Sequence, residues 1–345
     1  MLHLQAAACA RPSPATLEAE IAHLRLEHER GGYVAEAMAE ETVDGLRAGL
    51  GELLGTDADG VALVDSATSA LAALLAAWPL PHSGRVGLVP SEWGPNLVAF
   101  GHRGLDPVWL EADDHGQLDV DALDRRLRED PPDLVQLTQV AAHRAVVQPV
   151  AEALEVCRRQ GVPLWVDAAQ AAGHVDCAHG ADAAYAPGRK WLRGPRGVGF
   201  VAVAEQHRAA LRGGVTGLKP DDAHIAGRVG LAVAVRELLD AGPASICERL
   251  AERGAALRSA VAELPGWTSA DAPGTAAAIV SVRPTAGADV AATQRRLFDD
   301  HGILATASEP WRAPREMTEP LLRFAPHLDI TDADIERLVV ALALV

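Results

Sequence analysis

The stretch VDAAQAAGHVDCAHGADAAYAPGRKWLRGPRGVGF, residues 166–200, joins a short apolar run to a glycine-rich segment around a lysine. Among the 31 lysine and arginine residues of the chain, only Lys190 and Lys219 are lysines. An amine can lose its proton and attack an aldehyde, whereas a guanidinium stays charged. The preference for arginine elsewhere therefore indicates a chemical role for Lys190. The alternative is a surface lysine beside a glycine-rich loop.

Outward from this stretch, short runs rich in Val and Leu alternate with amphipathic segments, which is typical of a mainly parallel α/β sheet. We expect strands at 61–65, 85–90, 107–112, 133–138, 163–168 and 197–203. Helices are expected at 119–129, at 149–160 and from near Thr68. A further helix begins at Pro14, with Ser13 as its N-cap and with Leu17, Ile21 and Leu24 on one face.

Beyond residue 225 the pattern changes to long helices with few strands. We expect helices at 225–241, 244–263, 288–301 and 331–343, and strands at 276–282 and 321–325. A chain of 345 residues is long for one compact domain. We predict a large α/β domain over 15–225 and a small domain formed by 1–14 and 226–345.

The composition of the chain restricts which partners the protein binds and where in the cell we expect it. The net charge of −16 disfavours nucleic acids and anionic membranes and fits a neutral or cationic small-molecule substrate. No apolar run reaches the ~20 residues that span a bilayer. The N-terminal sequence MLHLQAAACARPSP lacks the pattern of a secretory signal. The four cysteines are scattered without a CxxC pair, so they indicate neither a metal site nor disulfides. We expect a cytoplasmic protein.

Other groups accompany Lys190 in an order that suits pyridoxal phosphate. Asp167 ends an apolar strand, where a carboxylate can hold the proton on the pyridine nitrogen of this cofactor. Ala67 and Thr68 lie after another strand and at a helix start, where backbone N–H groups attract phosphate. Arg189 adds a positive charge for the same phosphate. Each of these groups alone also fits a plain structural role, such as a helix cap or a surface charge.

The motifs SATS, EWGPN, VDAAQ, GRKW and GPRGVGF occur in an order that resembles class V of the aminotransferase family, which are fold type I pyridoxal-phosphate enzymes. The resemblance implies a large, mainly parallel α/β/α domain and a small α+β domain. It implies that Lys190 forms an imine with the cofactor. It further implies that Gln170 contacts the phenolic oxygen and that Trp93 stacks on the cofactor ring.

The resemblance also implies how the substrate is bound and that a second subunit contributes to the site. Arg323, in LLRFAPH, matches the arginine that binds the α-carboxylate of the substrate in class V, a task that suits a guanidinium fork. Arg228, in HIAGRVG, matches a segment that often reaches the phosphate bound by the neighbouring subunit. A homodimer is therefore implied.

Within class V the chain looks most like the hercynylcysteine sulfoxide lyases of ergothioneine biosynthesis. This likeness rests on RGGYVAEAMAE (30–40), PSEWGPNL (90–97), LTQVAAHRAVVQP (137–149), GHVDCAHGAD (173–182) and RAPREMTEPLLRFAPHLD (312–329). It implies β-elimination of a cationic betaine amino acid to a sulfenic acid, pyruvate and ammonia. Tyr33, Trp311 and Glu309 are candidates for holding the trimethylammonium group, and Tyr33 also for protonating the leaving sulfur. His143 and Arg144 are further candidates for substrate binding.

The chain also departs from the class pattern. The stretch ASEPWRAPREMTEP (307–320) has no cysteine, which argues against desulfurase chemistry. Pro187 stands where the class has a phosphate-binding serine, and Ala142 stands where many relatives have an asparagine. The alternatives are a class V aminotransferase or epimerase for another amino acid, a kynureninase-like hydrolase, and a family member that lacks the cofactor and is not an enzyme.

Overall fold

The computed structural model describes residues 1–220, 222–285 and 287–345. Its largest sheet has seven strands in the order β2-β8-β7-β6-β5-β3-β4. These are β2 (Val61–Val64), β3 (Gly84–Leu88), β4 (Leu105–Trp109), β5 (Leu134–Thr138), β6 (Leu164–Asp167), β7 (Ala183–Pro187) and β8 (Gly199–Val203). Strands β3 to β7 pair in parallel, whereas β8 runs antiparallel to both neighbours.

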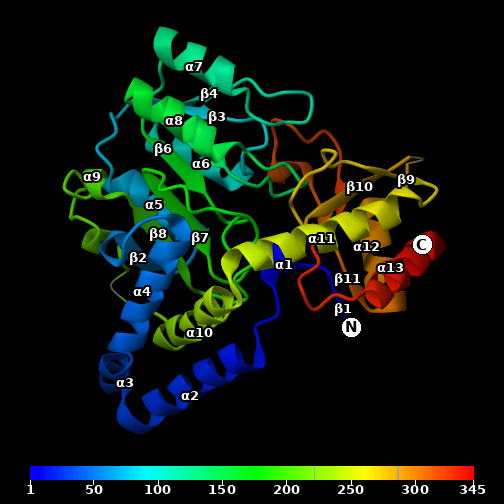
Figure 1. The fold of residues 1–345 in the computed structure, drawn as a ribbon, viewed down its shortest axis with the longest axis horizontal. Helices are drawn as coiled ribbons and strands as arrows, with labels where there is room; N and C mark the ends of the chain where they lie inside the picture. The colour runs from blue at the N-terminus through cyan, green and yellow to red at the C-terminus, as the bar shows by residue number, and fades with distance from the viewer. Residues whose placement is uncertain (221, 286) are drawn as a thin grey trace.

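Helices cover both faces of this sheet (Figure 1). Because successive strand residues point to opposite faces, Leu164 and Val166 join one apolar core while Trp165 joins the other. The first core lies under α4 (Glu40–Leu54), α7 (Val120–Glu129), α8 (Val150–Gln160) and α10 (Ile225–Ala241). The second lies under α5 (Ala67–Ala77) and α6 (Gly94–Arg103).

A smaller antiparallel sheet has the order β12-β13-β10-β9. Its strands are β9 (Trp267–Ser269), β10 (Val280–Pro284), β12 (Thr306–Ser308) and β13 (Leu321–Phe324), and a parallel pair joins β1 (Leu2–His3) to β11 (Ile303–Leu304). Leu257, Leu297 and Leu338 form its core with α11 (Pro243–Ala262), α12 (Val290–His301) and α13 (Asp332–Leu344). The remaining elements are α1 (Ala6–Cys9), α2 (Pro14–Arg30), α3 (Gly32–Met38), α9 (Glu205–Arg208), η1 (Ala58–Gly60), η2 (Thr216–Leu218) and η3 (Pro310–Arg312).

The predicted strands and helices are present, and two differences have physical reasons. The sequence does not predict β7, because its residues AAYAP carry no β-branched side chain and alanine has a low strand propensity. The strand predicted at 276–282 begins later, at Val280. The preceding backbone at Ala277 and Ala278 instead lies against Gly254 of α11, where an added Cβ would be 2.6 Å from the Cα of Ala278.

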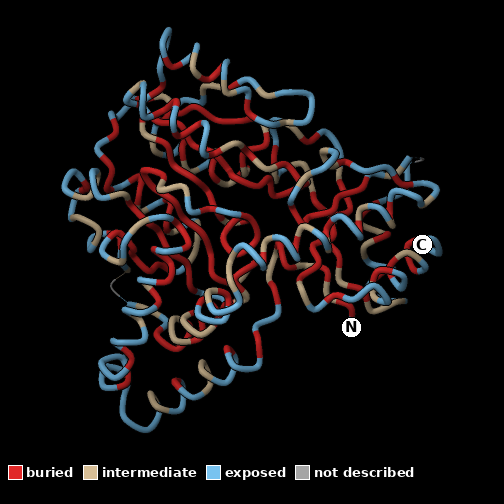
Figure 2. Tube along the Cα trace, viewed as in Figure 1, coloured by how far each residue is buried: buried red, intermediate tan, exposed pale blue. Residues whose placement is uncertain are grey.

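Helix α2 begins as predicted, since the Ser13 side chain accepts a hydrogen bond from the Thr16 N–H at 3.0 Å. The face that carries Leu17 and Leu24 does not pack on the core. Leu17 and Leu24 are exposed, and the buried residues of α2 are Thr16 and His23. Figure 2 shows mostly exposed residues along α2 and α3. This apolar face is therefore uncovered within one chain.

The packing of α10 bears on the predicted domain boundary at residue 225. This helix packs against α2 and α4, and its Leu231 and Val235 belong to a core of the large sheet. Gly242, with a φ of 83°, separates α10 from α11. We propose that the large domain extends to Gly242; the division into two domains remains a prediction. No helix in the described ranges is long and apolar enough to cross a membrane.

Gly199 lets the start of α5 approach the sheet. It is the first residue of β8, and a Cβ at this position would lie 2.8 Å from the backbone carbon of Ser66. Such an approach is too close for any side chain unless the backbone moves. The glycine therefore sets the position of Ser66, which caps α5.

We predict that Gly199→Ala lowers the free energy of unfolding by about 1–3 kcal/mol, because the methyl group overpacks a backbone contact. Urea unfolding measures this change. The control is Gly101→Ala on α6, where an added Cβ meets no atom within 4 Å. That control should leave stability unchanged or raise it by up to about 1 kcal/mol. Equal stabilities for the two variants would contradict the packing argument.

Candidate active site

The strand register brings the predicted site segments to one edge of the large sheet. Gly199 pairs both with Val64 at the end of β2 and with Pro187 at the end of β7. Asp167, at the end of β6, pairs with Tyr185 on β7 and with Thr138 on β5. The carboxyl ends of β2, β7, β6 and β5 therefore lie together, which is where α/β sheets place ligands.

Lys190 follows β7 in a turn at this edge. The turn is closed by the Arg193 N–H, which donates to the Lys190 carbonyl at 2.9 Å, and Arg193 has a φ of 59° that few non-glycine residues adopt. Burial lowers the pKa of Lys190 to about 7, although the Asp167 carboxylate opposes the change. The charges of Arg189, Arg323 and Arg312, in this order, add to the decrease. Much of this amine is therefore neutral near pH 7, the form that acts as nucleophile or base.

Asp167 is a buried carboxylate with two fixed hydrogen bonds. Its Oδ1 accepts from the Ala169 N–H at 2.8 Å, and its Oδ2 accepts from the Asn96 amide at 2.8 Å. Burial raises the pKa of Asp167, while Lys190 and Asn96 favour its charged form. The side chain is thus held at the end of β6, next to a cation, in one orientation.

Glu92 lies behind Asp167, and sequence reasoning missed it. Its Oε1 accepts from the Asn96 amide at 2.8 Å and from the Thr138 hydroxyl at 2.7 Å. Burial and the charge of Asp167 raise the pKa of Glu92 to about 8, so it is mostly protonated at neutral pH. Glu92 and Asn96 both belong to the EWGPN motif that the sequence singled out for Trp93. The sequence signal that could have revealed Glu92 was the presence of two polar residues, Glu92 and Asn96, in a segment whose side chains point into the interior.

The start of α5 offers free N–H groups. Ser66 and Ser69 form a reciprocal capping box, in which the Ser69 N–H donates to the Ser66 hydroxyl at 3.1 Å. Within the described part of the chain, the N–H groups of Ala67 and Thr68 have no hydrogen-bond acceptor. These two groups and the helix dipole make this end of α5 suitable for a phosphate.

Trp93 precedes α6 and contacts the small-domain segment η3. Its ring packs edge-on against Trp311 at 5.2 Å, and the Arg312 guanidinium lies 5.6 Å from the Trp93 ring centre. A Cβ on Gly94 would lie 2.0 Å from the Trp311 carbonyl oxygen, so only glycine permits this approach. Trp93 and Trp311 are therefore brought together, and Arg312 joins them although the sequence did not predict it.

Arg323 is a buried cation that has no carboxylate partner in the described part of the chain. The side chain is 1% exposed, and it lies on β13 beside Thr306 of β12 and Ser281 of β10. Its guanidinium donates to the Ala142 carbonyl and, at 3.4 Å, to the Thr306 hydroxyl, while its Nε has no partner among the described residues. Burial lowers the pKa of Arg323 to about 9. An uncompensated buried charge is costly, so this group is suited to an anion.

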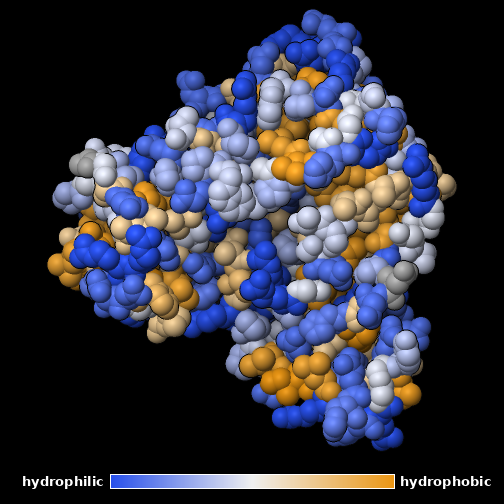
Figure 3. Space-filling view, turned by 180° about the vertical axis from the view of Figure 1, so that it is seen from behind, coloured by the Kyte–Doolittle hydropathy of each residue, from blue (hydrophilic) through white to orange (hydrophobic). Residues whose placement is uncertain are grey.

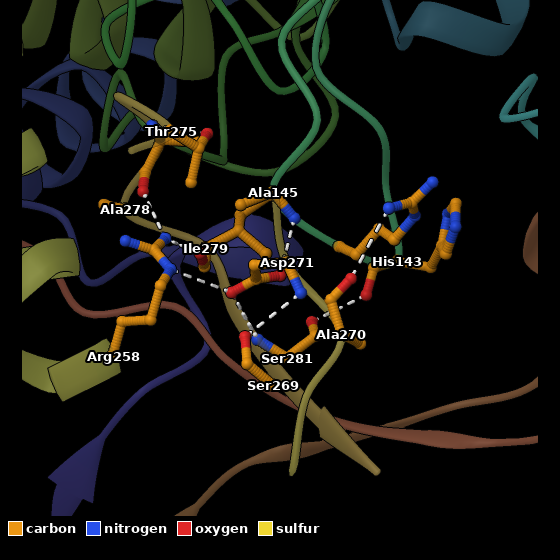
Figure 4. Close-up of polar contacts among 12 residues, drawn as sticks. His143, Ala145, Arg258, Ser269, Ala270, Asp271, Thr275, Ala278, Ile279 and Ser281 are labelled. Carbon is orange, nitrogen blue, oxygen red and sulfur yellow. Dashed lines mark hydrogen bonds and ion pairs between the residues drawn. The ribbon is translucent and has the colours of Figure 1, made fainter. Parts of the chain in front are cut away.

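The loop that supplies Ala142 is tied to the small sheet through Asp271 (Figure 4). The Asp271 carboxylate accepts from the Ala145 N–H at 2.9 Å, from the Ser281 N–H at 3.1 Å and from Arg258 Nε at 3.1 Å. The Ser281 hydroxyl also donates to the His143 carbonyl at 2.7 Å. These bonds fix the loop after β5 against β10, and so position the acceptor of Arg323.

His143 and Arg144, the predicted substrate contacts, both face Glu316. The Arg144 guanidinium donates to Glu316 Oε1, and His143 Nε2 lies 3.4 Å from the same oxygen. Although burial alone raises the pKa of Glu316, these two neighbours hold it below its usual value. Arg144 thus has a carboxylate partner within the chain, and its role with a substrate remains a prediction.

The remaining predicted residues have other neighbours. The Gln170 amide accepts from Trp191 Nε1 at 2.8 Å and donates to the Ala7 carbonyl at 2.8 Å, and the Arg189 guanidinium donates to the Ala8 carbonyl. Arg228 donates to the Leu63 carbonyl at 3.2 Å, beside the end of β2. Their cofactor contacts remain predictions.

Tyr33 is not brought to the site of its own chain. Its side chain is 91% exposed on α3, at the tip of the arm that α2 and α3 form (Figure 1). A contact between Tyr33 and a substrate remains a prediction that requires a second copy of the chain.

Comparisons with known proteins agree with this geometry. The sequence model of the family described as aminotransferase class-V matches residues 3–221. A probable hercynylcysteine sulfoxide lyase of Mycobacterium tuberculosis is 40% identical over 355 aligned residues, which cover 99% of this chain and 89% of that protein. The chain belongs to the class V aminotransferase family. Another class V relative, an isopenicillin N epimerase of Streptomyces clavuligerus, is 26% identical over 86% of this chain and 82% of its own.

Solved structures confirm the predicted fold of class V. An apo cysteine desulfurase from Thermococcus onnurineus NA1 has a TM-score of 0.89 at 18% identity, covering 99% of this chain and 94% of that one. The cystine C–S lyase C-DES, in complex with cysteine persulfide, has a TM-score of 0.88 at 18% identity, with 99% and 97% covered. The chain thus has the fold type I architecture, a mostly parallel α/β domain with a smaller α+β part.

The cofactor of this class V enzyme is pyridoxal phosphate, as predicted. The described residues fit it, because a partly neutral amine, a buried carboxylate and a helix start with free N–H groups share one sheet edge. Lys190 would carry the cofactor, Asp167 would face its pyridine nitrogen, and Ala67 and Thr68 would receive its phosphate. Among the described residues, no cluster of His, Cys, Asp and Glu could hold a metal ion.

We predict that pyridoxal phosphate attaches covalently to the apo protein faster as the pH rises. Only the neutral amine attacks an aldehyde, and the pKa of Lys190 lies at about 7, so the rate should rise between pH 6 and pH 8 and then level off. Stopped-flow absorbance of the cofactor measures this rate. Lys190→Ala should abolish the spectral change, whereas Lys219→Ala should retain it. A rate that keeps rising tenfold per pH unit to pH 10 would contradict the lowered pKa.

Proposed function

We propose that the chain is a pyridoxal-phosphate-dependent carbon–sulfur lyase that cleaves hercynylcysteine sulfoxide by β-elimination. The observation that carries the proposal is the buried guanidinium of Arg323, which lacks a carboxylate partner and lowers the pKa of Lys190. An α-amino acid carboxylate would satisfy this cation in a two-point contact. It would also bring Cα toward the amine of Lys190.

The proposed roles follow from the contacts of each residue. Pyridoxal phosphate supplies an electron sink for the pair left on Cα after deprotonation. Lys190, as a neutral amine, removes the Cα proton. Asp167, fixed by Asn96, would hold the proton on the pyridine nitrogen of the bound cofactor, and Trp93 would hold the cofactor ring. The Cα–H and Cβ–S bonds break, and sulfur leaves with its oxygen as a sulfenic acid.

The products follow from atom balance. The three-carbon fragment takes up water and becomes pyruvate and ammonia. Two equivalents of a thiol reduce the sulfenic acid to ergothioneine and are oxidised to a disulfide, with release of water. This choice of reaction is supported by the relative of Mycobacterium tuberculosis. It is also supported by the absence of a cysteine from 307–320, since desulfurase chemistry needs a thiol on that segment.

Other parts of the proposal concern the remaining substrate groups. His143 and Arg144 belong to the loop whose Ala142 carbonyl accepts from Arg323, and Trp311 lies beside Trp93. We assign His143 and Arg144 to the substrate side of the site, and Trp311 to its trimethylammonium group. A cytoplasmic location is part of the same proposal.

The test is mass spectrometry of the products after the holoenzyme is mixed with hercynylcysteine sulfoxide and a thiol. We expect ergothioneine and pyruvate in equal amounts. Lys190→Ala should lower the rate by about 10³-fold or more, since it removes the general base. Arg323→Gln should raise KM about 10- to 100-fold through the lost charge-assisted hydrogen bonds.

Two outcomes would contradict the proposal. Unchanged substrate with a fully loaded cofactor would exclude this substrate. An amino-group transfer or an epimerised product would instead identify an aminotransferase or epimerase. Arg126→Gln serves as the control, because this arginine lies on the solvent side of α7 and pairs only with Asp130. It should leave turnover unchanged.

We further propose that the chain acts as a homodimer through the arm formed by α2 and α3. This arm exposes a group of large apolar side chains: Leu17, Leu24, Tyr33, Val34 and Met38. Figure 3 shows hydrophobic surface among polar surface on the lower part of the molecule. A second copy, as the family resemblance implies, would cover these side chains and bring Arg228 near the partner's phosphate.

We predict that light scattering gives twice the mass of one chain. The double variant Leu24→Asp, Val34→Asp should yield monomers, since two charges cannot be buried in an apolar interface. Val340→Asp is the control, because Val340 is also an exposed apolar residue but lies on α13. A monomeric wild type, or a control that dissociates equally, would contradict the proposed interface.

A further inference from the structure

Arg312 is a second cation without a carboxylate partner near Lys190. It is the last residue of η3, and its Nε is buried without a hydrogen-bond partner. Within the described ranges its guanidinium forms no ion pair, in contrast to Arg144, which pairs with Glu316. Burial lowers the pKa of Arg312, and the nearest charge that opposes this is Glu309.

The position of Arg312 is fixed by the close approach of η3 to α6. A Cβ on Gly94 would overlap the Trp311 carbonyl oxygen, so the backbone of η3 packs directly against the start of α6. The Arg312 guanidinium lies 4.7 Å from the Trp311 ring centre and 5.6 Å from that of Trp93. Trp93 follows Glu92, which shares the amide of Asn96 with Asp167. Arg312 is thus separated from the site by the ring of Trp93.

The site therefore has an excess of positive charge in a chain whose net charge is −16. Lys190, Arg323 and Arg312 lie within electrostatic range of one another, and the opposing carboxylates are Asp167 near Lys190 and Glu309 near Arg312. Glu92 adds little negative charge, since the pKa of its carboxyl is about 8. One α-carboxylate pairs with Arg323 and leaves Arg312 unsatisfied. A partly buried cation whose Nε has no hydrogen-bond partner among the described residues favours a second anionic group.

We propose that Arg312 binds a second carboxylate of the substrate, so that the site selects amino acids that carry two carboxylates. The inference rests on the proposed function, because hercynylcysteine sulfoxide has a betaine carboxylate at the end remote from its cysteine group. Arg323 then holds the α-carboxylate and Arg312 holds the remote one. Two guanidinium groups on different elements, β13 and η3, fix both ends of the substrate across Lys190.

The aromatic rings beside Arg312 suit the rest of a betaine. A betaine places a quaternary ammonium next to its carboxylate, and such a cation binds to the faces of indole rings. Trp311 is 52% exposed and offers a ring face beside Arg312. An anion bound to Arg312 therefore places its neighbouring cation against Trp311. Arg312 and Trp311 would together bind both charges of the zwitterion.

The experiment compares two substrates with the holoenzyme: hercynylcysteine sulfoxide, and the analogue in which hydrogen replaces the betaine carboxylate. We expect the wild type to prefer the full substrate by about 10- to 100-fold in KM, as one charge-assisted contact predicts. Arg312→Gln should abolish this preference and leave kcat for the full substrate within about twofold. Arg323→Gln should raise KM for both substrates.

The matched control is Arg315→Gln. Arg315 lies three residues further along and its guanidinium is 5.3 Å from the Trp109 ring centre, so it is also an arginine on an indole ring. It should retain the preference for the carboxylate. A preference that survives in Arg312→Gln, or that is lost equally in Arg315→Gln, overturns the proposal. Loss of folding is checked by the cofactor absorbance of each variant.

A second measurement separates this proposal from the proposed reaction. If the wild type cleaves neither substrate, the lyase assignment fails, and binding is then measured by titrating the cofactor absorbance. The probes are S-(2-carboxyethyl)-L-cysteine and its neutral counterpart S-(2-carbamoylethyl)-L-cysteine. Tighter binding of the acid, abolished in Arg312→Gln, supports the dicarboxylate site for another amino acid. Equal binding of the two probes by the wild type overturns it.

Discussion

The common direction of β2, β5, β6 and β7 is the constraint on which the site depends. Because these strands are in register, their carboxyl ends form one edge, and the chain returns to that edge each time a strand ends. Gly199 pairs with strand ends on both sides and leaves space for the start of α5. One sheet thus gathers the amine of Lys190, the carboxylate of Asp167 and the helix terminus at Ala67, which precedes Asp167 by 100 positions in the sequence.

The second half of the site comes from the small sheet, and buried polar contacts hold it in place. Asp271 connects the loop after β5 with β10, and that loop gives Arg323 its carbonyl partner. The approach of Gly94 to Trp311 makes a second connection through η3. The first connection consists of hydrogen bonds from backbone N–H groups to a side-chain carboxylate, and the second is a backbone contact that leaves no space for a side chain. Together they position Arg323 and Arg312 relative to the large sheet.

Much of the fold and part of the site could be predicted from the sequence. Lys190, Asp167 and the start of α5 lie in local sequence patterns that indicate their chemistry. These patterns are a rare amine, a polar residue that ends an apolar strand, and small hydroxyl residues before a helix. Glu92 and Arg312 could not be found in this way. Their significance lies in missing partners and in burial, which depend on contacts between distant segments. The exposure of Leu17 and Leu24 on α2 could not be predicted either, because periodicity reveals an apolar face but not what covers it.

The unpaired arginines have a consequence for when Lys190 is reactive. Their charges lower the proton affinity of the amine in the free enzyme. A carboxylate that binds to Arg323 neutralises one of these charges, so the proton affinity of Lys190 rises as the substrate arrives. The free amine of Lys190 is thus a stronger base with an anion on Arg323 than in the apo protein. In the proposed reaction, once Lys190 has released the cofactor, the α-carboxylate of the bound substrate would strengthen the base that accepts the Cα proton.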